Sequence, residues 1–132
     1  MILLDNLSTG RLANIEHLRS RDDVEFVQGS ILNADLVDDV VSRVDQVFHL
    51  AAAVGVELIV EKPLESLMTN IRGTETVIEK AHKYDKRTLV TSTSEIYGKN
   101  TSDSLSEEDD RILGSPLKSR WSYSEAKAID EI

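Results

Sequence analysis

The sequence predicts an α/β fold built on a parallel sheet. Short apolar runs of strand length alternate with amphipathic segments of helical spacing, in the order strand, helix, strand, helix, strand, helix, strand, loop, helix. This alternation is typical of parallel sheets, because a helix between two strands returns the chain to the end where the next parallel strand begins. The 132 residues are enough for one small domain, and they contain no internal repeat and no low-complexity tract.

The composition is that of a folded, acidic protein. Hydrophobic residues make up 40% of the chain and charged residues 30%, and the formal net charge is −9. Nucleic-acid surfaces need clustered Lys and Arg, so we expect no nucleic-acid partner. We expect no membrane partner and a cytoplasmic location, because no apolar run is long enough to span a bilayer. The chain has no Cys, and its His residues lack metal-ligand spacing, so the sequence predicts neither a disulfide nor a metal site.

The first quarter of the chain predicts two strands with a short helical segment between them. Residues 1–5 form a continuous apolar run that ends in an acid, which suits a strand buried on both faces. A loop of small polar residues follows at 6–10, and residues 11–19 are a short amphipathic segment. Residues 24–28 predict the second strand, closed by Gly29.

A helix and a third strand come next. Residues 34–44 have apolar side chains at helical spacing, and Asn33 is a suitable N-cap for that helix. Residues 46–50 predict the third strand, which runs into three Ala at 51–53. Small residues at a strand end allow a ligand to approach the backbone closely, or they only allow a helix to pack tightly. The sequence does not decide between these two interpretations.

The remaining elements are a long helix, a fourth strand and a final helix. Residues 54–62 predict a loop or a broken helix, and Pro63 suits the first turn of an amphipathic helix over residues 63–84. Residues 86–92 predict the fourth strand, which ends in a cluster of hydroxyl side chains. Residues 99–120 are a long polar loop, and such loops are uncommon unless they are functional or mobile. The final helix begins near Ser122.

Tyr123 and Lys127 are the candidate catalytic pair. They are four residues apart, so on a helix the phenol and the ammonium lie on the same face. A nearby ammonium favours the phenolate, so we expect a lowered pKa for Tyr123, which would make it a general base near neutral pH. A hydroxyl at the end of the fourth strand can bind the same substrate oxygen. The alternative is an exposed pair with no catalytic role.

Five short segments in order resemble the extended short-chain dehydrogenase/reductase superfamily, in particular its NAD-dependent nucleotide-sugar epimerases, dehydratases and decarboxylases. The segments are Leu-Asp-Asn-Leu-Ser-Thr-Gly at 4–10, Phe-His-Leu-Ala-Ala at 48–52, Lys-Pro at 62–63 with Asn-Ile-Arg-Gly-Thr at 70–74, Ser-Thr-Ser-Glu-Ile-Tyr-Gly at 92–98, and Tyr-Ser-Glu-Ala-Lys at 123–127. The resemblance covers essentially the whole chain. The resemblance implies a Rossmann-type fold and NAD as the cofactor.

The resemblance also implies which residues bind NAD. Asp5 matches the acid that accepts hydrogen bonds from the adenosine ribose, and its charge suits NAD better than NADP. Ser30 stands where the family usually has Asp, which weakens the contact with the adenine. The cofactor-binding set is Asp5, Asn6, Ser8, Thr9, Gly10, Ser30, Ile31, Leu50, Ala51, Ala52, Tyr123 and Lys127.

The implied catalytic residues are Thr93, Glu95, Tyr123 and Lys127. Thr93 matches the family's catalytic Ser/Thr, Tyr123 its base, and Lys127 the residue that holds the nicotinamide ribose. Asn70 and Ser94 match substrate-binding positions. The run Thr-Ser-Glu at 93–95 is most similar to enzymes that act on UDP-glucuronate, either decarboxylases or 4-epimerases, which work through a 4-keto sugar. The alternative for Glu95 is a solvated loop carboxylate.

In this family a first strand and a G-x-x-G-x-x-G turn come before the segment that Met1 begins, and a substrate domain follows the segment that Ile132 ends. We therefore expect residues 1–132 to be an incomplete NAD-binding Rossmann domain: a doubly wound parallel sheet without its central first strand, from the second strand to the start of the Tyr-x-x-x-Lys helix. The isolated chain is expected to bind NAD weakly and to be inactive. The alternative is a non-catalytic binding or homodimerisation module, formed through residues 63–84 and the last helix, or a remnant without function.

Overall fold

The computed structural model describes residues 1–55 and 61–132, so the loop or broken helix expected at 54–62 lies partly outside the described residues. The described residues group into two compact units. The first unit contains residues 1–51 and 75–89, and the second contains residues 52–74 and 90–132. The long helix α4 (Pro63–Lys83) contributes residues to both units.

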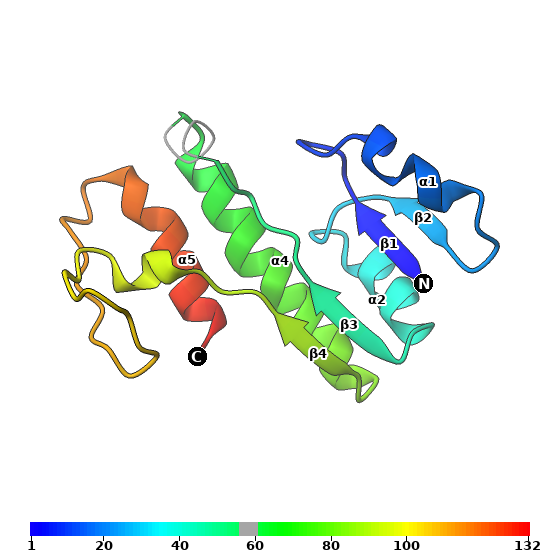
Figure 1. Ribbon diagram of the computed structural model, residues 1–132. Helices are drawn as coiled ribbons and strands as arrows, with labels where there is room; N and C mark the ends of the chain where they lie inside the picture. The colour runs from blue at the N-terminus through cyan, green and yellow to red at the C-terminus, as the bar shows by residue number, and fades with distance from the viewer. Residues whose placement is uncertain (56–60) are drawn as a thin grey trace. The chain divides into compact units, whose positions relative to one another are not determined.

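Parallel strands form the sheets of the first unit. β1 (Ile2–Asp5) pairs in parallel with β2 (Glu25–Gln28), with Leu3 opposite Phe26. β3 (Gln46–His49) pairs with β4 (Arg87–Val90), and their arrows point the same way in Figure 1. The parallel pairing and the alternation with helices confirm the predicted α/β class.

The two strand pairs are separate sheets within the described residues. This is the expected break, because a doubly wound sheet places one central strand between β1 and β3. The apolar residues at the end of β3 are correspondingly open to solvent: Phe48 and Leu50 are each 64% exposed. β1, the apolar run that was expected to be buried on both faces, is likewise only half-buried at Ile2, Leu3 and Leu4.

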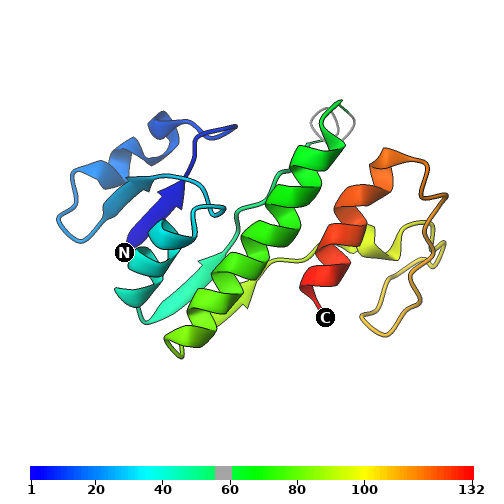
Figure 2. The ribbon, with the colours of Figure 1, turned by 180° about the vertical axis from the view of Figure 1, so that it is seen from behind.

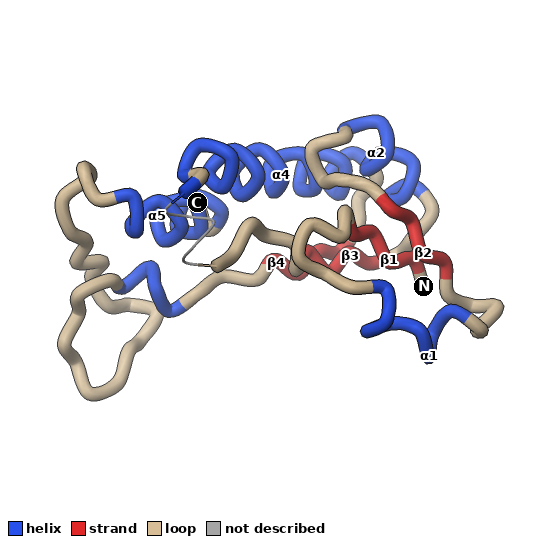
Figure 3. The backbone as a smooth tube through the Cα atoms, turned by 90° about the horizontal axis from the view of Figure 1, so that it is seen from above, coloured by secondary structure: helices blue, strands red, loops and turns tan. Residues whose placement is uncertain are grey.

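Helices α2 (Ala34–Ser42) and α4 cover one side of the strands of the first unit. Figure 3 shows α2 and residues 75–83 of α4 on one side of the strands and α1 (Glu16–Arg19) on the other, and Figure 2 shows α4 across β3 and β4. The core formed between these helices and the sheets contains Ile31, Val37, Val41, Val77 and Ala81, with Leu4, Val47 and Tyr84 packed against it.

The ends of these helices are fixed by side chains. Asn33 caps α2 as predicted, because its side-chain oxygen accepts the Leu36 N–H at 3.2 Å. At the end of α4, Lys83 and the Tyr84 hydroxyl both donate to the Asp38 carboxylate of α2, at 2.6 and 2.7 Å. These bonds join α2 to the last turn of α4 across the core.

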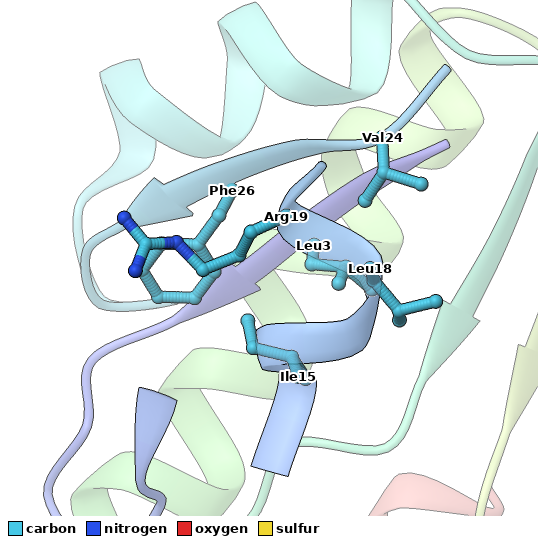
Figure 4. A pocket seen from close by; sticks show the side chains of 6 residues that line it. All are labelled: Leu3, Ile15, Leu18, Arg19, Val24 and Phe26. Atoms are coloured by element: carbon cyan, nitrogen blue, oxygen red, sulfur yellow. The ribbon is translucent and has the colours of Figure 1, made fainter. Parts of the chain in front are cut away.

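The other side of the β1–β2 sheet is covered by a 3-10 turn, η1 (Leu12–Ile15), and by α1. This cover is incomplete and leaves a hollow of about 120 Å³ (Figure 4). The hollow is lined by Leu3, Ile15, Leu18, Arg19, Val24 and Phe26. Its lining is mainly apolar, as expected beneath a short amphipathic segment, and it contains none of the predicted site residues.

The second unit contains two short 3-10 turns and one helix after β4. They are η2 (Ser94–Tyr97), η3 (Ser119–Trp121) and α5 (Ser122–Asp130). The long loop between η2 and η3 is closed at its base, because the Lys99 N–H donates to the Ile112 carbonyl at 2.7 Å. None of the helices within residues 1–55 and 61–132 is both long and apolar enough to cross a bilayer.

Candidate functional site

In the first unit, the loop after β1 wraps around the carboxylate of Asp5. Asp5 Oδ1 accepts the Leu7 N–H at 2.6 Å, and a Cβ added at Gly10 would lie 3.3 Å from the same oxygen. Asn6 stabilises the loop by accepting the Ser8 N–H at 3.0 Å. Asp5 itself is exposed, as are Ser8 and Thr9. An exposed carboxylate in a tight cradle of backbone fits the two neighbouring hydroxyls of a ribose, so these residues fit the adenosine side of NAD.

The other predicted cofactor residues of the first unit differ in exposure. Ser30 Oγ accepts the Leu32 N–H at 3.2 Å in the turn after β2. The Ile31 side chain lies in the hydrophobic core and is 9% exposed, so its packing role is established directly by the structure. Leu50 and Ala51 are exposed just beyond β3. An apolar surface at a strand end suits contact with a flat ligand.

In the second unit, Asn70 of α4 holds the segment that follows β3. Asn70 Oδ1 accepts the Ala53 N–H at 2.7 Å, and Asn70 Nδ2 donates to the Ala53 carbonyl at 3.1 Å. Ser66 Oγ donates to the same carbonyl at 3.4 Å. Asn70 and Ser66 are each 1% exposed. Both polar ends of the Asn70 amide are thus engaged by the backbone next to Ala52.

Thr93 lies where the chain leaves β4 and begins η2. Its backbone is extended, and its Oγ1 accepts the Glu95 N–H at 3.3 Å, which makes it the N-cap of η2. A hydroxyl whose oxygen already accepts a backbone N–H still has its own proton to donate. Ser94 and Glu95 are exposed on the same turn. The turn therefore carries the hydroxyls of Thr93 and Ser94 and the carboxylate of Glu95.

Tyr123 and Lys127 both lie on α5, as predicted, and α5 packs against η2. The Lys127 ammonium donates to Asp130 Oδ2 at 3.1 Å, and the two side chains are 2% and 4% exposed. The same carboxylate oxygen accepts the Thr74 hydroxyl of α4 at 3.2 Å. Lys127 is thus a buried, paired cation, which excludes the interpretation of an exposed Tyr–Lys pair.

The expected pKa of Tyr123 was wrong in direction. Burial raises the pKa of Tyr123 first of all, and the negative charges of Glu95 and Asp130 raise it further. The physical reason is that the ammonium of Lys127 is paired with the carboxylate of Asp130. The negative charge of this carboxylate offsets the positive charge that would otherwise stabilise the phenolate of Tyr123. In this structure Tyr123 holds its proton more tightly than a free tyrosine does.

A polar pocket of about 570 Å³ lies beside Thr93 in the second unit. It is lined by the strand end at 90–93, by Ile96 and Tyr97, and by the acidic residues Glu107, Glu108, Asp130 and Glu131. Burial, followed by the surrounding carboxylates, raises the pKa of Tyr97 on its wall. Tyr123 and Lys127 do not line it, so the pocket adjoins Thr93 without containing the whole predicted catalytic set.

Sequence reasoning missed three residues that organise the second unit: Thr74, Arg111 and Asp130. Arg111 donates to the Ile96 carbonyl at 3.4 Å and to Glu125 of α5 at 3.0 Å, so it joins η2 to α5. Asp130 could have been found as an acid three residues after Lys127 on a predicted helix. Thr74 and Arg111 gave no such signal, because their partners are distant in the sequence.

The structure thus brings Thr93, Glu95, Tyr123 and Lys127 into one compact unit, together with Asn70 and Ala52. The predicted cofactor residues Asp5, Asn6, Ser8, Thr9, Gly10, Ser30, Ile31, Leu50 and Ala51 lie in the other unit.

Comparisons with known proteins show the family of the chain. The family model described as GDP-mannose 4,6-dehydratase matches residues 1–132. The chain is 38% identical over 129 residues to UDP-N-acetyl-alpha-D-glucosaminuronate decarboxylase of Bacillus cytotoxicus, which covers 98% of this chain and 39% of that protein. It is 33% identical over 129 residues to UDP-glucuronic acid decarboxylase 1 of Xenopus tropicalis, covering 98% of the chain and 29% of that protein.

A solved structure shows the same fold. The dTDP-glucose 4,6-dehydratase of Streptomyces venezuelae, a double mutant with NAD bound, superposes with a TM-score of 0.87 at 28% identity. The match covers 98% of this chain and 39% of that one. The chain therefore spans between 29% and 39% of the length of these relatives.

Proposed function

The chain belongs to the GDP-mannose 4,6-dehydratase family, and from this premise we propose that it supplies the hydroxyl, phenol and ammonium with which a nucleotide-sugar enzyme oxidises C4 of its sugar. This membership confirms the resemblance to the nucleotide-sugar epimerases and dehydratases of the extended short-chain dehydrogenase/reductase superfamily. We further propose NAD as the cofactor, with Asp5 accepting the hydroxyls of the adenosine ribose. When bound, NAD takes up the hydride that leaves C4.

The observation that supports this proposal most strongly is that Thr93 and Tyr123 lie in the same unit, on two elements, η2 and α5, that pack against each other. The Thr93 hydroxyl has its oxygen occupied by the Glu95 N–H and keeps its proton to donate to O4 of the sugar. Tyr123 takes the proton of the 4-OH as the C4–H bond breaks, which leaves a C4 carbonyl. Lys127 holds the ribose hydroxyls that lie beside the phenol.

We propose a UDP-linked uronic acid as the substrate class, with Ser94 and Glu95 beside the sugar. A carbonyl at C4 makes the C6 carboxylate part of a β-keto acid. The C5–C6 bond can then break with loss of CO₂, its electron pair moves into the C4 carbonyl, and C5 is protonated. Epimerisation at C4 is the alternative outcome, when hydride returns to the other face of the carbonyl and Tyr123 gives its proton back.

We propose a different role for Asn70 from the one that the family resemblance implies. Its amide is bonded to the Ala53 backbone at both ends. We propose that Asn70 shapes the backbone at 51–53 against which the dinucleotide lies, rather than binding the sugar itself.

A chimera provides the test, because the chain spans 39% of the Bacillus cytotoxicus decarboxylase. Residues 1–132 would replace the matching segment of that enzyme, and the chain alone would be assayed beside it. With NAD and a UDP-uronate labelled in its carboxyl group, we expect labelled CO₂ from the chimera and none from the chain alone. A folded chimera that binds NAD but forms neither CO₂, a 4-keto sugar nor the 4-epimer would overturn the proposed chemistry.

A second candidate function is homodimerisation through α4 and α5. Three apolar side chains on these helices are open to solvent: Leu64 is 70% exposed, Ile78 41% and Ile129 51%. Large apolar side chains that a helix leaves exposed to solvent suit a helix–helix interface. Sedimentation equilibrium should give a dimer mass for the chain and a monomer mass for Ile78→Lys, and a monomeric chain would remove this candidate.

A further inference from the structure

The ammonium of Lys127 is held in place by its own helix. Lys127 Nζ lies 3.1 Å from Asp130 Oδ2, and the pair is formed one helical turn apart with both side chains at most 4% exposed. A lysine side chain has four rotatable bonds, so its ammonium is ordinarily free to take many positions. Here it has a fixed partner inside the unit.

A second bond fixes the partner. The Thr74 hydroxyl of α4 donates to the same Asp130 oxygen at 3.2 Å, and Thr74 is 2% exposed. The carboxylate therefore has bonds from two helices and little freedom to turn away. An unpaired buried charge is strongly unfavourable, so the ammonium and the carboxylate depend on each other in this interior.

We propose that Asp130 is a positioning residue of the site: it fixes the ammonium of Lys127 on the inner face of α5, and Thr74 fixes Asp130 in turn. This inference rests on the proposed function, because Lys127 is the residue that would hold the ribose beside Tyr123. Neither Asp130 nor Thr74 would touch the substrate in this role. They act through the lysine.

The pair also sets the charge around the phenol. The charged groups that act on Tyr123 are Glu95 from η2 and Asp130 from its own helix, and Lys127 is the cation that Asp130 balances. Further carboxylates share the pocket wall with Asp130, namely Glu107, Glu108 and Glu131. Removing the charge of Asp130 takes one anion away from the phenol and leaves the ammonium of Lys127 unbalanced. Both effects favour the phenolate.

The test uses the chain itself, without NAD or sugar. The variants are Asp130→Asn, Asp130→Glu and Thr74→Val, with Glu125→Gln as the matched control that removes an exposed carboxylate from the same helix. The first readout is the ¹H–¹⁵N NMR signal of the Lys127 ammonium, assigned by its loss in Lys127→Arg. The second is the absorbance titration of Tyr123, isolated by subtraction of Tyr123→Phe.

We expect the ammonium signal in the unmodified chain, in Asp130→Glu and in Glu125→Gln, and its loss to solvent exchange in Asp130→Asn. The titration midpoint of Tyr123 should fall in Asp130→Asn, fall less in Thr74→Val and stay unchanged in Glu125→Gln. A purely structural role for Asp130 would lower the melting temperature without moving this midpoint. If Asp130→Asn does not fold, Thr74→Val decides: a lower midpoint supports the proposal.

The proposal is overturned if Asp130→Asn, or Thr74→Val where the former does not fold, leaves the Tyr123 midpoint unchanged, or if Glu125→Gln lowers it as much. These readouts need no turnover. A chimera without activity would therefore contradict the proposed function but not the positioning role of Asp130. An unchanged titration midpoint of Tyr123 would contradict the positioning role but not the proposed function.

Discussion

Asn70 binds the backbone of Ala53 at both its N–H and its carbonyl, and Asn70 is 1% exposed. The first of these bonds is the shorter, at 2.7 Å, and the second is 3.1 Å. A side-chain amide that meets a backbone in this way replaces the bonds of a sheet ladder where the strand has ended. The path of the chain after β3 thus depends on one residue of α4.

Replacing Asn70 with Ala should lower the stability of the chain. The change leaves the partly buried Ala53 N–H without this partner and the Ala53 carbonyl with Ser66 alone, and an unsatisfied buried group costs about 1–3 kcal/mol. Urea denaturation followed by circular dichroism measures the difference. The exposed Asn14→Ala serves as the control, with an expected change within about 0.5 kcal/mol. Equal midpoints for the two variants would show that the Asn70–Ala53 bonds do not stabilise the fold.

Gly98 should not tolerate a side chain. Its φ is 62°, and an added Cβ would lie 2.5 Å from the Ile112 carbonyl oxygen, at the bridge that closes the 99–111 loop. Gly55 is the matched control, because its φ of 112° is also positive, but no atom of the described residues beyond its chain neighbours lies within 4 Å of an added Cβ. Both Ala variants carry a backbone cost of about 1–3 kcal/mol, and Gly98→Ala adds the steric clash. Thermal melting of the two variants should therefore rank Gly98→Ala as clearly the less stable, and the reverse order would contradict the loop closure described here.

Asp38 should make the stability of the first unit depend on pH. The Lys83 ammonium foremost, and then the Tyr84 hydroxyl, hold the pKa of Asp38 below its ordinary value. A carboxyl group with a lowered pKa stabilises the fold fully above its unfolded pKa of about 4, and this contribution is lost as the pH falls through the lower folded value.

The variant Asp38→Asn should therefore be less stable than the unmodified chain at neutral pH, and the difference should shrink as the solution is acidified below about pH 4. Denaturation at a series of pH values measures it. The exposed Asp45→Asn is the control and should follow the unmodified chain throughout. A difference that stays constant down to strong acid would mean that the Lys83–Asp38 pair does not act through its charge.

Much of the fold follows from local sequence signals, because each acts within one turn or one strand. The apolar stripe predicted α4 to within a residue of its end, and Asn33 predicted the cap of α2 through its bond to Leu36. The same spacing argument placed Tyr123 and Lys127 on one helix. Such signals do not depend on where the rest of the chain lies.

The electrostatics of the site could not be predicted from local sequence signals. The pKa of Tyr123 depends on burial, on Glu95 of another element and on Asp130, so its direction required the folded arrangement. The bond from Thr74 to Asp130 joins residues 56 positions apart, and no local pattern indicates it. Asn70 matched a substrate-binding position by sequence, whereas its partner in the structure is the backbone of Ala53. Long-range partners decide what these side chains do.

The central claim is that Tyr123 takes the proton of the sugar 4-OH, and the most direct measurement is single-turnover formation of NADH by the chimera as a function of pH. Because the pKa of Tyr123 is raised, the rate should climb with pH from neutrality, by about tenfold per pH unit while the phenol remains mostly protonated. Tyr123→Phe should lower the rate by about 10²- to 10⁴-fold and abolish that slope, while NAD remains bound. A Tyr123→Phe chimera that forms NADH at the unmodified rate and with the same pH dependence would contradict the account.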